Sequence, residues 1–402
     1  MKRWIIAVLI ALLCAPFADA KPAKQPVKPA KKVQAGPGTR QAKAPAAKAE
    51  PCKAYIVMEA LTGKVIEGEN IHERRPPASV TKLMVALIVL EKLASGEVKL
   101  TDRITASEEA SKIGGSQVYL KAGETFSLEE MMKAILVASG NDAAYAVAEH
   151  IAGSKDGFVK LMNEKAKALN MVDTEFRSVH GLPPSKGQEP DLTSANDLAV
   201  LSRELLKYPQ LLQWTSLKTE PFRDGKFIMN NHNKLLTKMG GVDGLKTGYY
   251  AQTGFNVAAT AVRNDVRLIV VVLGSPSASI RDSFAIEKFK KAFGQYKMLN
   301  VVKRGEVIDK NVILVDGKYP RMKGVAGANF AYPIPVDKKG TVQKEIVLPA
   351  KISGEIREGQ RLGELIVKFD NEVIGKVDIV SPVYVPKANL FTRFIRRLGL
   401  NI

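Results

Sequence analysis

The sequence predicts a mixed α/β domain, with an antiparallel sheet and a mostly helical part, followed by a smaller all-β domain and a terminal amphipathic helix. Up to about residue 298, runs with helical periodicity are interleaved with β-rich runs. From about Leu299 the pattern changes to short alternating runs separated by Gly, Pro and Asp, as in small β domains. A chain of 402 residues also exceeds one ordinary core, so we expect about two or three domains.

The chain begins with the three parts of a secretory signal, which we assign to residues 1–20. Met1-Lys2-Arg3 supplies positive charge, an apolar run extends to Phe17, and Ala18-Asp19-Ala20 has the A-x-A form of a cleavage site. We therefore predict cleavage after Ala20 and export. An uncleaved membrane anchor is the alternative, but the apolar run is shorter than the roughly 20 residues that cross a bilayer.

Residues 21–50 predict a disordered basic linker. They hold eight Lys and Arg against the single acid Glu50, mixed with Ala, Pro and Gly, so they cannot form a core. The linker either is simply solvated or adheres to an anionic surface. The formal net charge of +19 on an exported chain favours anionic lipid headgroups or cell-wall polymers over nucleic acid as partners.

Cysteine and histidine usage predicts neither a disulfide nor a metal site. Removal of the signal leaves Cys52 as the only cysteine, which excludes an intrachain disulfide. The histidines are scattered without i,i+4 pairing or an accompanying acidic cluster. We expect no metal and no cofactor.

The α/β domain is assigned to residues 51–298. A hairpin over 54–65 opens it, and Ser79 begins a helix whose run from Leu83 to Leu90 is apolar on all sides, as expected of a buried helix ending at Ser95-Gly96. Ser127 and Glu130 form a capping-box pattern. Further helices are predicted over 127–137, 143–151 (after an Asp142 cap), 157–169, 194–206 and 284–293, and strands over 255–262 and 266–273.

The β-rich domain is assigned to residues 299–386, with short strands over 312–315, 345–348 and 365–367. Residues 387–402 form the predicted amphipathic helix. One face carries Leu390, Phe391, Phe394, Ile395 and Leu398, with Arg393, Arg396 and Arg397 elsewhere. Such a helix can lie flat in a lipid interface, and docking onto the protein itself is the alternative.

Three short polar motifs in the α/β domain predict acyl-transfer chemistry. They are Ser79-Val80-Thr81-Lys82, Ser139-Gly140-Asn141 and Lys246-Thr247-Gly248. A serine hydroxyl is a poor nucleophile without a nearby base, and a spacing of three places Ser79 and Lys82 on one helical face. Each motif alone is a weak signal, whereas all three in this order are specific.

These residue types assign roles to the motifs. Ser79 would attack a carbonyl and Lys82 would take its proton, giving an acyl-enzyme that water resolves. Because a free lysine has a pKa of about 10.4, Lys82 must be buried beside a second cation, for which Lys246 is the candidate. Ser139 would relay a proton to the departing amine, and Asn141 would orient substrate and base.

The third motif predicts how the substrate is held. Lys246 and Thr247 would bind a terminal carboxylate, and Gly248 would let the substrate backbone approach the strand edge.

A family resemblance rests on five segments: Leu61-Thr62-Gly63-Lys64-Val65, Arg75-Pro76-Pro77-Ala78-Ser79-Val80-Thr81-Lys82, Ala138-Ser139-Gly140-Asn141-Asp142-Ala143, Val179-His180-Gly181-Leu182 and Val242-Asp243-Gly244-Leu245-Lys246-Thr247-Gly248. Over roughly residues 51 to 402 the chain resembles the low-molecular-mass penicillin-binding proteins that act as D-alanyl-D-alanine carboxypeptidases. The resemblance implies a β-lactamase/transpeptidase-like fold for the α/β domain.

The resemblance also implies an activity and a location. The enzyme would be a serine-type D-Ala-D-Ala carboxypeptidase that removes the terminal D-alanine from peptidoglycan pentapeptides, is acylated by β-lactams, and works in the periplasm, peripheral on the outer face of the inner membrane. A D,D-endopeptidase or a weak β-lactamase on the same scaffold, and a non-catalytic muropeptide-binding protein, are the alternatives. Ser139-Gly140-Asn141, where β-lactamases typically carry Ser-Asp-Asn, favours the carboxypeptidase.

By the same resemblance, Arg281 would recognise the substrate carboxylate, although its sequence context also fits a surface arginine. The backbone amides of Ser79 and Tyr249 would form the oxyanion hole. Two positions depart from close relatives, which often have His at Tyr249 and Arg at His232. Glu189 is interpreted as a solvated loop acid rather than a deacylation residue.

Overall fold

The computed structural model describes residues 50–397. The predicted signal peptide, the predicted linker before Glu50 and the predicted helix beyond Arg397, including Leu398, lie outside the described residues. Within them, no helix is both long enough and apolar enough to cross a membrane.

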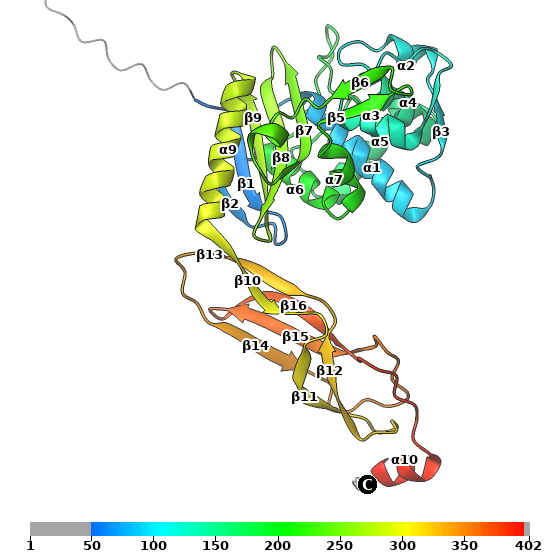
Figure 1. The fold of residues 1–402 in the computed structure, drawn as a ribbon, viewed down its shortest axis with the longest axis vertical. Helices are drawn as coiled ribbons and strands as arrows, with labels where there is room; N and C mark the ends of the chain where they lie inside the picture. The colour runs from blue at the N-terminus through cyan, green and yellow to red at the C-terminus, as the bar shows by residue number, and fades with distance from the viewer. Residues whose placement is uncertain (1–49, 398–402) are drawn as a thin grey trace, which may run out of the picture. The chain divides into compact units, whose positions relative to one another are not determined.

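The α/β domain is built on a five-stranded antiparallel sheet in the order β2-β1-β9-β8-β7 (Figure 1). The predicted opening hairpin is confirmed as β1 and β2, and Lys246 lies on β7, which pairs with β8. The five strands are β1 (Ala54–Glu59), β2 (Val65–Glu69), β7 (Val242–Tyr250), β8 (Gly254–Arg263) and β9 (Val266–Ser275).

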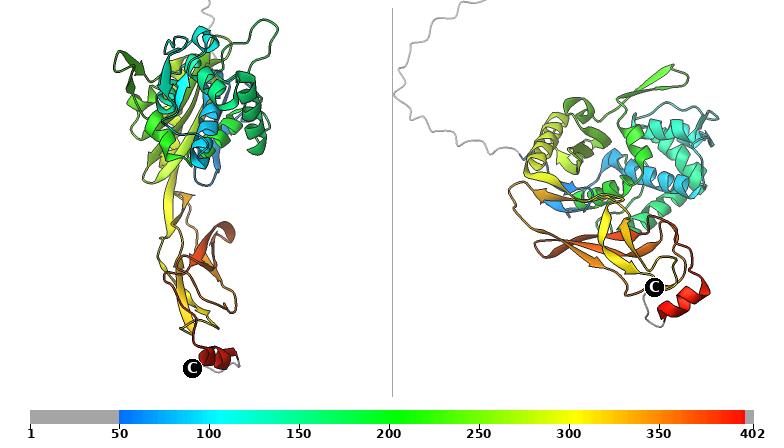
Figure 2. Two further views of the ribbon diagram at one scale, coloured as in Figure 1. Left: turned by 90° about the vertical axis from the view of Figure 1, so that its right-hand side faces the viewer. Right: turned by 60° about the horizontal axis from the view of Figure 1, so that its bottom comes forward.

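The central strand β9 shows why both faces of this sheet are covered. Alternate residues of a strand point to opposite faces. In β9, Ile269, Val271 and Leu273 belong to one buried cluster, whereas Leu268, Val270 and Val272 belong to another. The helix α9 (Ala278–Gln295) covers the second face, and the larger helical part lies on the first (Figures 1 and 2).

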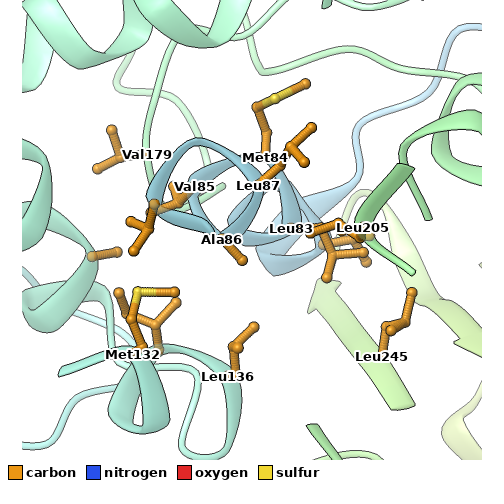
Figure 3. Close-up of a cluster of buried hydrophobic side chains, with 14 of the residues drawn as sticks. Leu83, Met84, Val85, Ala86, Leu87, Met132, Leu136, Val179, Leu205 and Leu245 are labelled. Carbon is orange, nitrogen blue, oxygen red and sulfur yellow. The ribbon is translucent and has the colours of Figure 1, made fainter. Parts of the chain in front are cut away.

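The predicted buried helix is confirmed as α1 (Lys82–Ser95), whose residues from Lys82 to Leu90 are all buried. It passes between the sheet and the surrounding helices, so that its side chains meet Met132, Leu136, Val179, Leu205 and Leu245 (Figure 3). The helix ends at Gly96, whose φ of +78° is a left-handed conformation that favours glycine. A short 3-10 helix, η1 (Ala78–Thr81), leads directly into α1 and carries Ser79.

The five further predicted helices are found as α3, α4, α5, α6 and α9, with two corrections, whereas the short helices α2, α7 and α8 were not predicted. The predicted Asp142 cap is wrong, because α4 begins at Asn141 after Gly140, and Asp142 lies inside its first turn. The helix predicted over 284–293 is α9. It begins at Ala278, six residues earlier than predicted, because Ser277 caps it. The elements are α2 (Glu108–Lys112), α3 (Leu128–Leu136), α4 (Asn141–Ala152), α5 (Lys155–Ala168), α6 (Ala195–Leu205), α7 (Pro209–Thr215) and α8 (Leu235–Lys238), with hairpins β3 (Arg103–Thr105)/β4 (Thr125–Ser127) and β5 (Thr219–Phe222)/β6 (Phe227–Asn230).

The predicted all-β domain is confirmed. It contains a two-stranded pair, β10-β13, and a five-stranded sheet in the order β11-β12-β16-β15-β14, around an apolar cluster of its own. The short helix α10 (Leu390–Arg397) follows (Figure 2). The strands are β10 (Tyr296–Val302), β11 (Val307–Ile313), β12 (Arg321–Ala326), β13 (Phe330–Pro335), β14 (Val342–Val347), β15 (Arg361–Phe369) and β16 (Glu372–Val380).

Candidate active site

The three motifs meet where η1 packs against β7. A cavity of about 500 Å³ opens there, and Lys82, Asn141 and Lys246 are buried behind its wall. The predicted site residues that line the cavity are Ser79, Ser139, Thr247, Gly248, Tyr249 and Arg281.

The buried amine of Lys82 has three partners. Its Nζ lies 3.0 Å from Ser79 Oγ, 2.6 Å from Asn141 Oδ1 and 2.8 Å from the backbone oxygen of His180. The amide and backbone oxygens can only accept, so two protons of Nζ are directed at them. In a neutral amine this leaves the lone pair for the Ser79 hydroxyl, which is the arrangement that proton abstraction requires.

The surroundings of Lys82 favour the neutral amine. Burial is the largest cause that lowers the pKa of Lys82 well below its usual value, and the neighbouring charge of Lys246 lowers it further. The carboxylates of Asp191 and Asp142 act in the opposite direction but do not reverse the shift. Lys82 is thereby suited to act as a base near neutral pH.

Lys246 is poised between its two protonation states. Burial, followed by the charge of Arg281, lowers its pKa to about 7. In β7 its Nζ donates to the backbone oxygen of Thr247 at 3.0 Å. A carboxylate brought into the cavity would favour the charged form, so ligand binding and protonation of Lys246 are coupled.

Ser139 is held in an unusual conformation. Its φ of +62° lies in the left-handed region, which is uncommon for a serine and is often associated with functional sites. Its Oγ is buried and has no hydrogen-bond partner among residues 50–397. Since buried hydroxyls are rarely left unpaired, this oxygen is available to a ligand. The neighbouring Asn141 is oriented by its Nδ2, which donates to the backbone oxygen of Gly114 at 2.7 Å.

Two glycines make room for the segment that carries Ser79. A Cβ at Gly248 would overlap the backbone oxygen of Pro77 and lie 3.0 Å from Ser79 N. A Cβ at Gly181, whose φ is +75°, would overlap the backbone oxygen of Ala78 and also lie 3.0 Å from Ser79 N. We expected Gly248 to admit the substrate backbone, and the structure adds a different reason, which is the close approach of the protein's own chain.

Arg281 is buried in the first turn of α9, so the surface-arginine alternative is wrong. Its Nε and Nη2 donate to Asp282 Oδ1 at 2.9 and 2.6 Å, and its Nη1 donates to the backbone oxygen of Asn256 at 3.3 Å. Lys238 Nζ donates to the other oxygen of Asp282 at 2.7 Å. The guanidinium is therefore fixed in orientation at the cavity wall.

Tyr249, the departure from the usual histidine, is exposed at the edge of the cavity. Its ring stacks on Phe255 at a centroid distance of 4.0 Å. Tyr249 in β7 and Ser79 in η1 line the same cavity, where oxyanion-hole amides would be needed.

Sequence reasoning missed the buried carboxylate of Asp191. It accepts hydrogen bonds from the backbone amides of Arg177 and Ser178 at 2.6 and 2.8 Å, and from Thr81 Oγ1 at 3.1 Å. It thus ties the loop that supplies the His180 oxygen to the residue before Lys82. Its neighbour Glu189 is exposed and borders a separate cavity of about 600 Å³, in agreement with a solvated loop acid.

Comparison with known proteins decides the family. Residues 39–277 match the family model of D-alanyl-D-alanine carboxypeptidase, peptidase S11, and residues 296–387 match the C-terminal domain of penicillin-binding protein 5. The chain belongs to the S11 family of D-alanyl-D-alanine carboxypeptidases. The predicted resemblance is confirmed, and with it a serine-type D-Ala-D-Ala carboxypeptidase of the penicillin-binding class.

Some relatives match most of this S11 chain, and others match a shorter part of it. It is 35% identical to the carboxypeptidase DacF of Bacillus subtilis, over 99% of this chain and 98% of DacF. Penicillin-binding protein 5 of Haemophilus influenzae is 27% identical with a TM-score of 0.67, over 84% of this chain and 98% of that one. Penicillin-binding protein D2 of Listeria monocytogenes, solved in an ampicillin-bound form, is 30% identical with a TM-score of 0.54, over 60% of this chain and 96% of that one. The family acts on the cell wall, which implies export.

Proposed function

We propose that Ser79 is the nucleophile of this carboxypeptidase and that Lys82 is its general base. The observation that carries the proposal is the set of contacts of Lys82 Nζ. Two acceptors, Asn141 Oδ1 and the His180 backbone oxygen, hold its protons, and Ser79 Oγ lies 3.0 Å away. Burial keeps the amine neutral, so it can take the hydroxyl proton at neutral pH.

The reaction would proceed in two displacements. In the first, Ser79 Oγ bonds to the carbonyl carbon of the penultimate D-alanine while Lys82 takes its proton, and the C–N bond breaks as Ser139 relays that proton from Lys82 to the departing amine, which leaves Lys82 neutral. In the second, Lys82 deprotonates a water that attacks the ester, and the proton returns to Ser79 Oγ. The unpartnered Ser139 Oγ supports its role in the first displacement.

Lys246, Thr247 and Arg281 would bind the terminal carboxylate of the substrate. Arg281 lines the cavity and Lys246 is buried behind its wall, so both cations are available to a carboxylate. The hydrogen bond from Arg281 to Asp282 fixes the orientation of the guanidinium. The backbone amides of Ser79 and Tyr249 would stabilise the oxyanion. The substrate would be the peptidoglycan pentapeptide stem, with release of D-alanine.

Covalent labelling tests the nucleophile. A fluorescent penicillin should label the unmutated protein and fail to label Ser79→Ala. Ser95→Ala, which removes an exposed serine at the other end of α1, should label normally. Absence of label on the unmutated protein, or undiminished labelling of Ser79→Ala, would contradict the proposal.

The alternatives on the same scaffold are separated by product. Released D-alanine, cleaved cross-links and hydrolysed penicillin should be measured side by side on one preparation. We expect D-alanine release from pentapeptide to be the fastest of the three. Faster cleavage of cross-links would make the protein an endopeptidase.

We further propose a periplasmic location with peripheral attachment to the outer face of the inner membrane through α10. Leu390, Phe391 and Phe394 are exposed, and the helix also carries Arg393. An apolar face with flanking cations suits an interface with anionic lipid. Deletion of residues 388–402 should release the protein from membranes, and unchanged association would refute this part of the proposal.

A further inference from the structure

A second cavity, of about 340 Å³, adjoins the catalytic cavity and shares Ser116 and His232 with it. Its outer rim is formed by Tyr119 and by the β5–β6 hairpin, through Phe227 and Ile228. Among the described residues that line it, none is Asp, Glu, Lys or Arg. Burial, followed by the charge of Lys246, lowers the pKa of His232 to about 4, so this side chain is neutral too. The lining of the catalytic cavity beside it, in contrast, includes Lys234, Lys238 and Arg281 against the single acid Asp282.

Tyr119 is held at the rim in a strained backbone conformation. Its φ is +58°, which is rare for an aromatic residue, and Tyr119 is 64% exposed. A bulky apolar residue that is both strained and exposed beside a cavity suggests a functional role. Its ring meets Phe227 edge to face, with centroids 6.1 Å apart.

Two charged side chains keep Tyr119 in this conformation. The buried carboxylate of Asp142 accepts hydrogen bonds from the backbone amides of Val118 and Leu120, at 3.1 and 3.0 Å. On the other side, Arg223 donates to the backbone oxygens of Val118 and Tyr119, at 2.6 and 2.7 Å. Asp142 directly follows Asn141, so the rim is tied to the first turn of α4.

The residues that line this cavity favour an uncharged, largely apolar ligand. Exposed apolar side chains at Tyr119 and Ile228, the latter 52% exposed, favour burial of an apolar group. The amides of Gln117 and Asn230 can satisfy an occasional polar atom. A charged group would lose its hydration without gaining a counter-ion.

The position of the cavity indicates which part of the substrate enters it. One wall is Ala138, the residue before Ser139, which would protonate the departing amine. The shared residue His232 lines the catalytic cavity together with Arg281, which would hold the terminal carboxylate. The released residue carries both of those groups, so its side chain would be the part of the substrate nearest this cavity.

We propose that this cavity is a subsite for the side chain of the released C-terminal residue, and that the enzyme accepts bulky uncharged D-residues there in addition to D-alanine. The inference rests on the proposed roles of Ser139 and Arg281. The bond cleaved and the water consumed are the same as for D-alanine. Only the residue that leaves differs.

A substrate panel tests the subsite. Acylated dipeptides D-Ala-D-Xaa, with D-Ala, D-Leu, D-Phe or D-Lys at the end, are assayed for the free D-residue. We expect kcat/KM for D-Leu and D-Phe within about tenfold of D-Ala, and for D-Lys at least about 100-fold lower. In Tyr119→Asn and Ile228→Ser, the ratio of kcat/KM for D-Leu to that for D-Ala should fall by about tenfold.

The variants are chosen to separate binding from folding. Asparagine tolerates a left-handed backbone, so Tyr119→Asn removes the ring and relieves strain, and its thermal stability should not fall. Val172→Ser removes a side chain that is 81% exposed elsewhere in the domain, and should leave the ratio unchanged.

The possible outcomes test the proposed function and the subsite separately. No hydrolysis of D-Ala-D-Ala would contradict the proposed function itself. Hydrolysis of D-Ala-D-Ala with less than about 1% of that rate on D-Leu and D-Phe would overturn the subsite alone. Acceptance of D-Leu with the same ratio in Tyr119→Asn and Ile228→Ser would also overturn it, because the tolerance would then arise elsewhere.

Discussion

Replacement of Gly248 by alanine should slow acylation without unfolding the protein. The added Cβ would lie 3.0 Å from Ser79 N and from Val80 N, and would overlap the backbone oxygen of Pro77 more deeply. Ordinary contact of a Cβ begins at 3.4 Å, so Ser79 must move by at least 3.4 − 3.0 = 0.4 Å and Pro77 by more. The segment that carries Ser79 should thus shift by about 0.5 to 1 Å. Since a misplacement of about 1 Å can cost about 100-fold in rate, we expect a loss of roughly 10- to 100-fold.

The measurement is the second-order rate of labelling by a fluorescent penicillin, followed by D-alanine release from a pentapeptide. Overpacking should also cost about 1–3 kcal/mol of stability, so thermal unfolding must confirm that Gly248→Ala remains folded at the assay temperature. Gly294→Ala is the matched control, because a Cβ there meets nothing within 4 Å. A folded Gly248→Ala protein that acylates within about threefold of the unmutated rate would show that close approach to η1 is not why glycine is needed.

Three further predictions concern charge. The pKa of about 7 for Lys246 predicts that KM for a D-Ala-D-Ala peptide rises as pH increases through 7, and a KM independent of pH from 6 to 8.5 would contradict this. Asp282→Asn should raise KM about tenfold by freeing Arg281, but should have little effect in an Arg281→Ala background, whereas additive losses would contradict coupling. Burial raises the pKa of Glu67, but hydrogen bonds led by that from Lys288 outweigh it and lower the pKa to about 2, from 4.5. Its stabilisation is therefore present above pH 4.5 and lost towards pH 2, so the difference in Tm between unmutated protein and Glu67→Gln should shrink over that range, and a constant difference would oppose it.

The parts of the fold that the sequence predicted are those set by local pattern. The run from Leu83 to Leu90 has no polar face, and such a helix must lie inside a core. The capping box is equally local, and the structure contains both of its bonds, from Glu130 N to Ser127 Oγ and from Ser127 N to Glu130 Oε2. The capping box could be predicted because Ser127 and Glu130 are only three residues apart in the sequence.

The parts that sequence reasoning missed depend on partners far along the chain. The backbone oxygen that holds Lys82 belongs to His180, 98 residues away, and a backbone oxygen has no sequence signature. Asp191 bonds to Thr81 across 110 residues and stands in a loop without a motif. The tight packing of Gly181 against Ala78 is likewise invisible until the chain is folded. Motifs identify groups that react, but not the backbone that positions them.

The reactivity of the site follows from the packing of α1. Burial is the largest cause of the lowered pKa of Lys82, and that burial exists because the helix beginning at this residue passes through the centre of the domain. The charge of Lys246 adds to the effect but is itself weakened, since its own pKa is about 7. A mutation that loosened the core around Leu83 or Leu87 would therefore admit water to the amine, raise its pKa and slow acylation, even though neither side chain could contact substrate. The packing of the core around α1 therefore helps to set the basicity that we propose for Lys82.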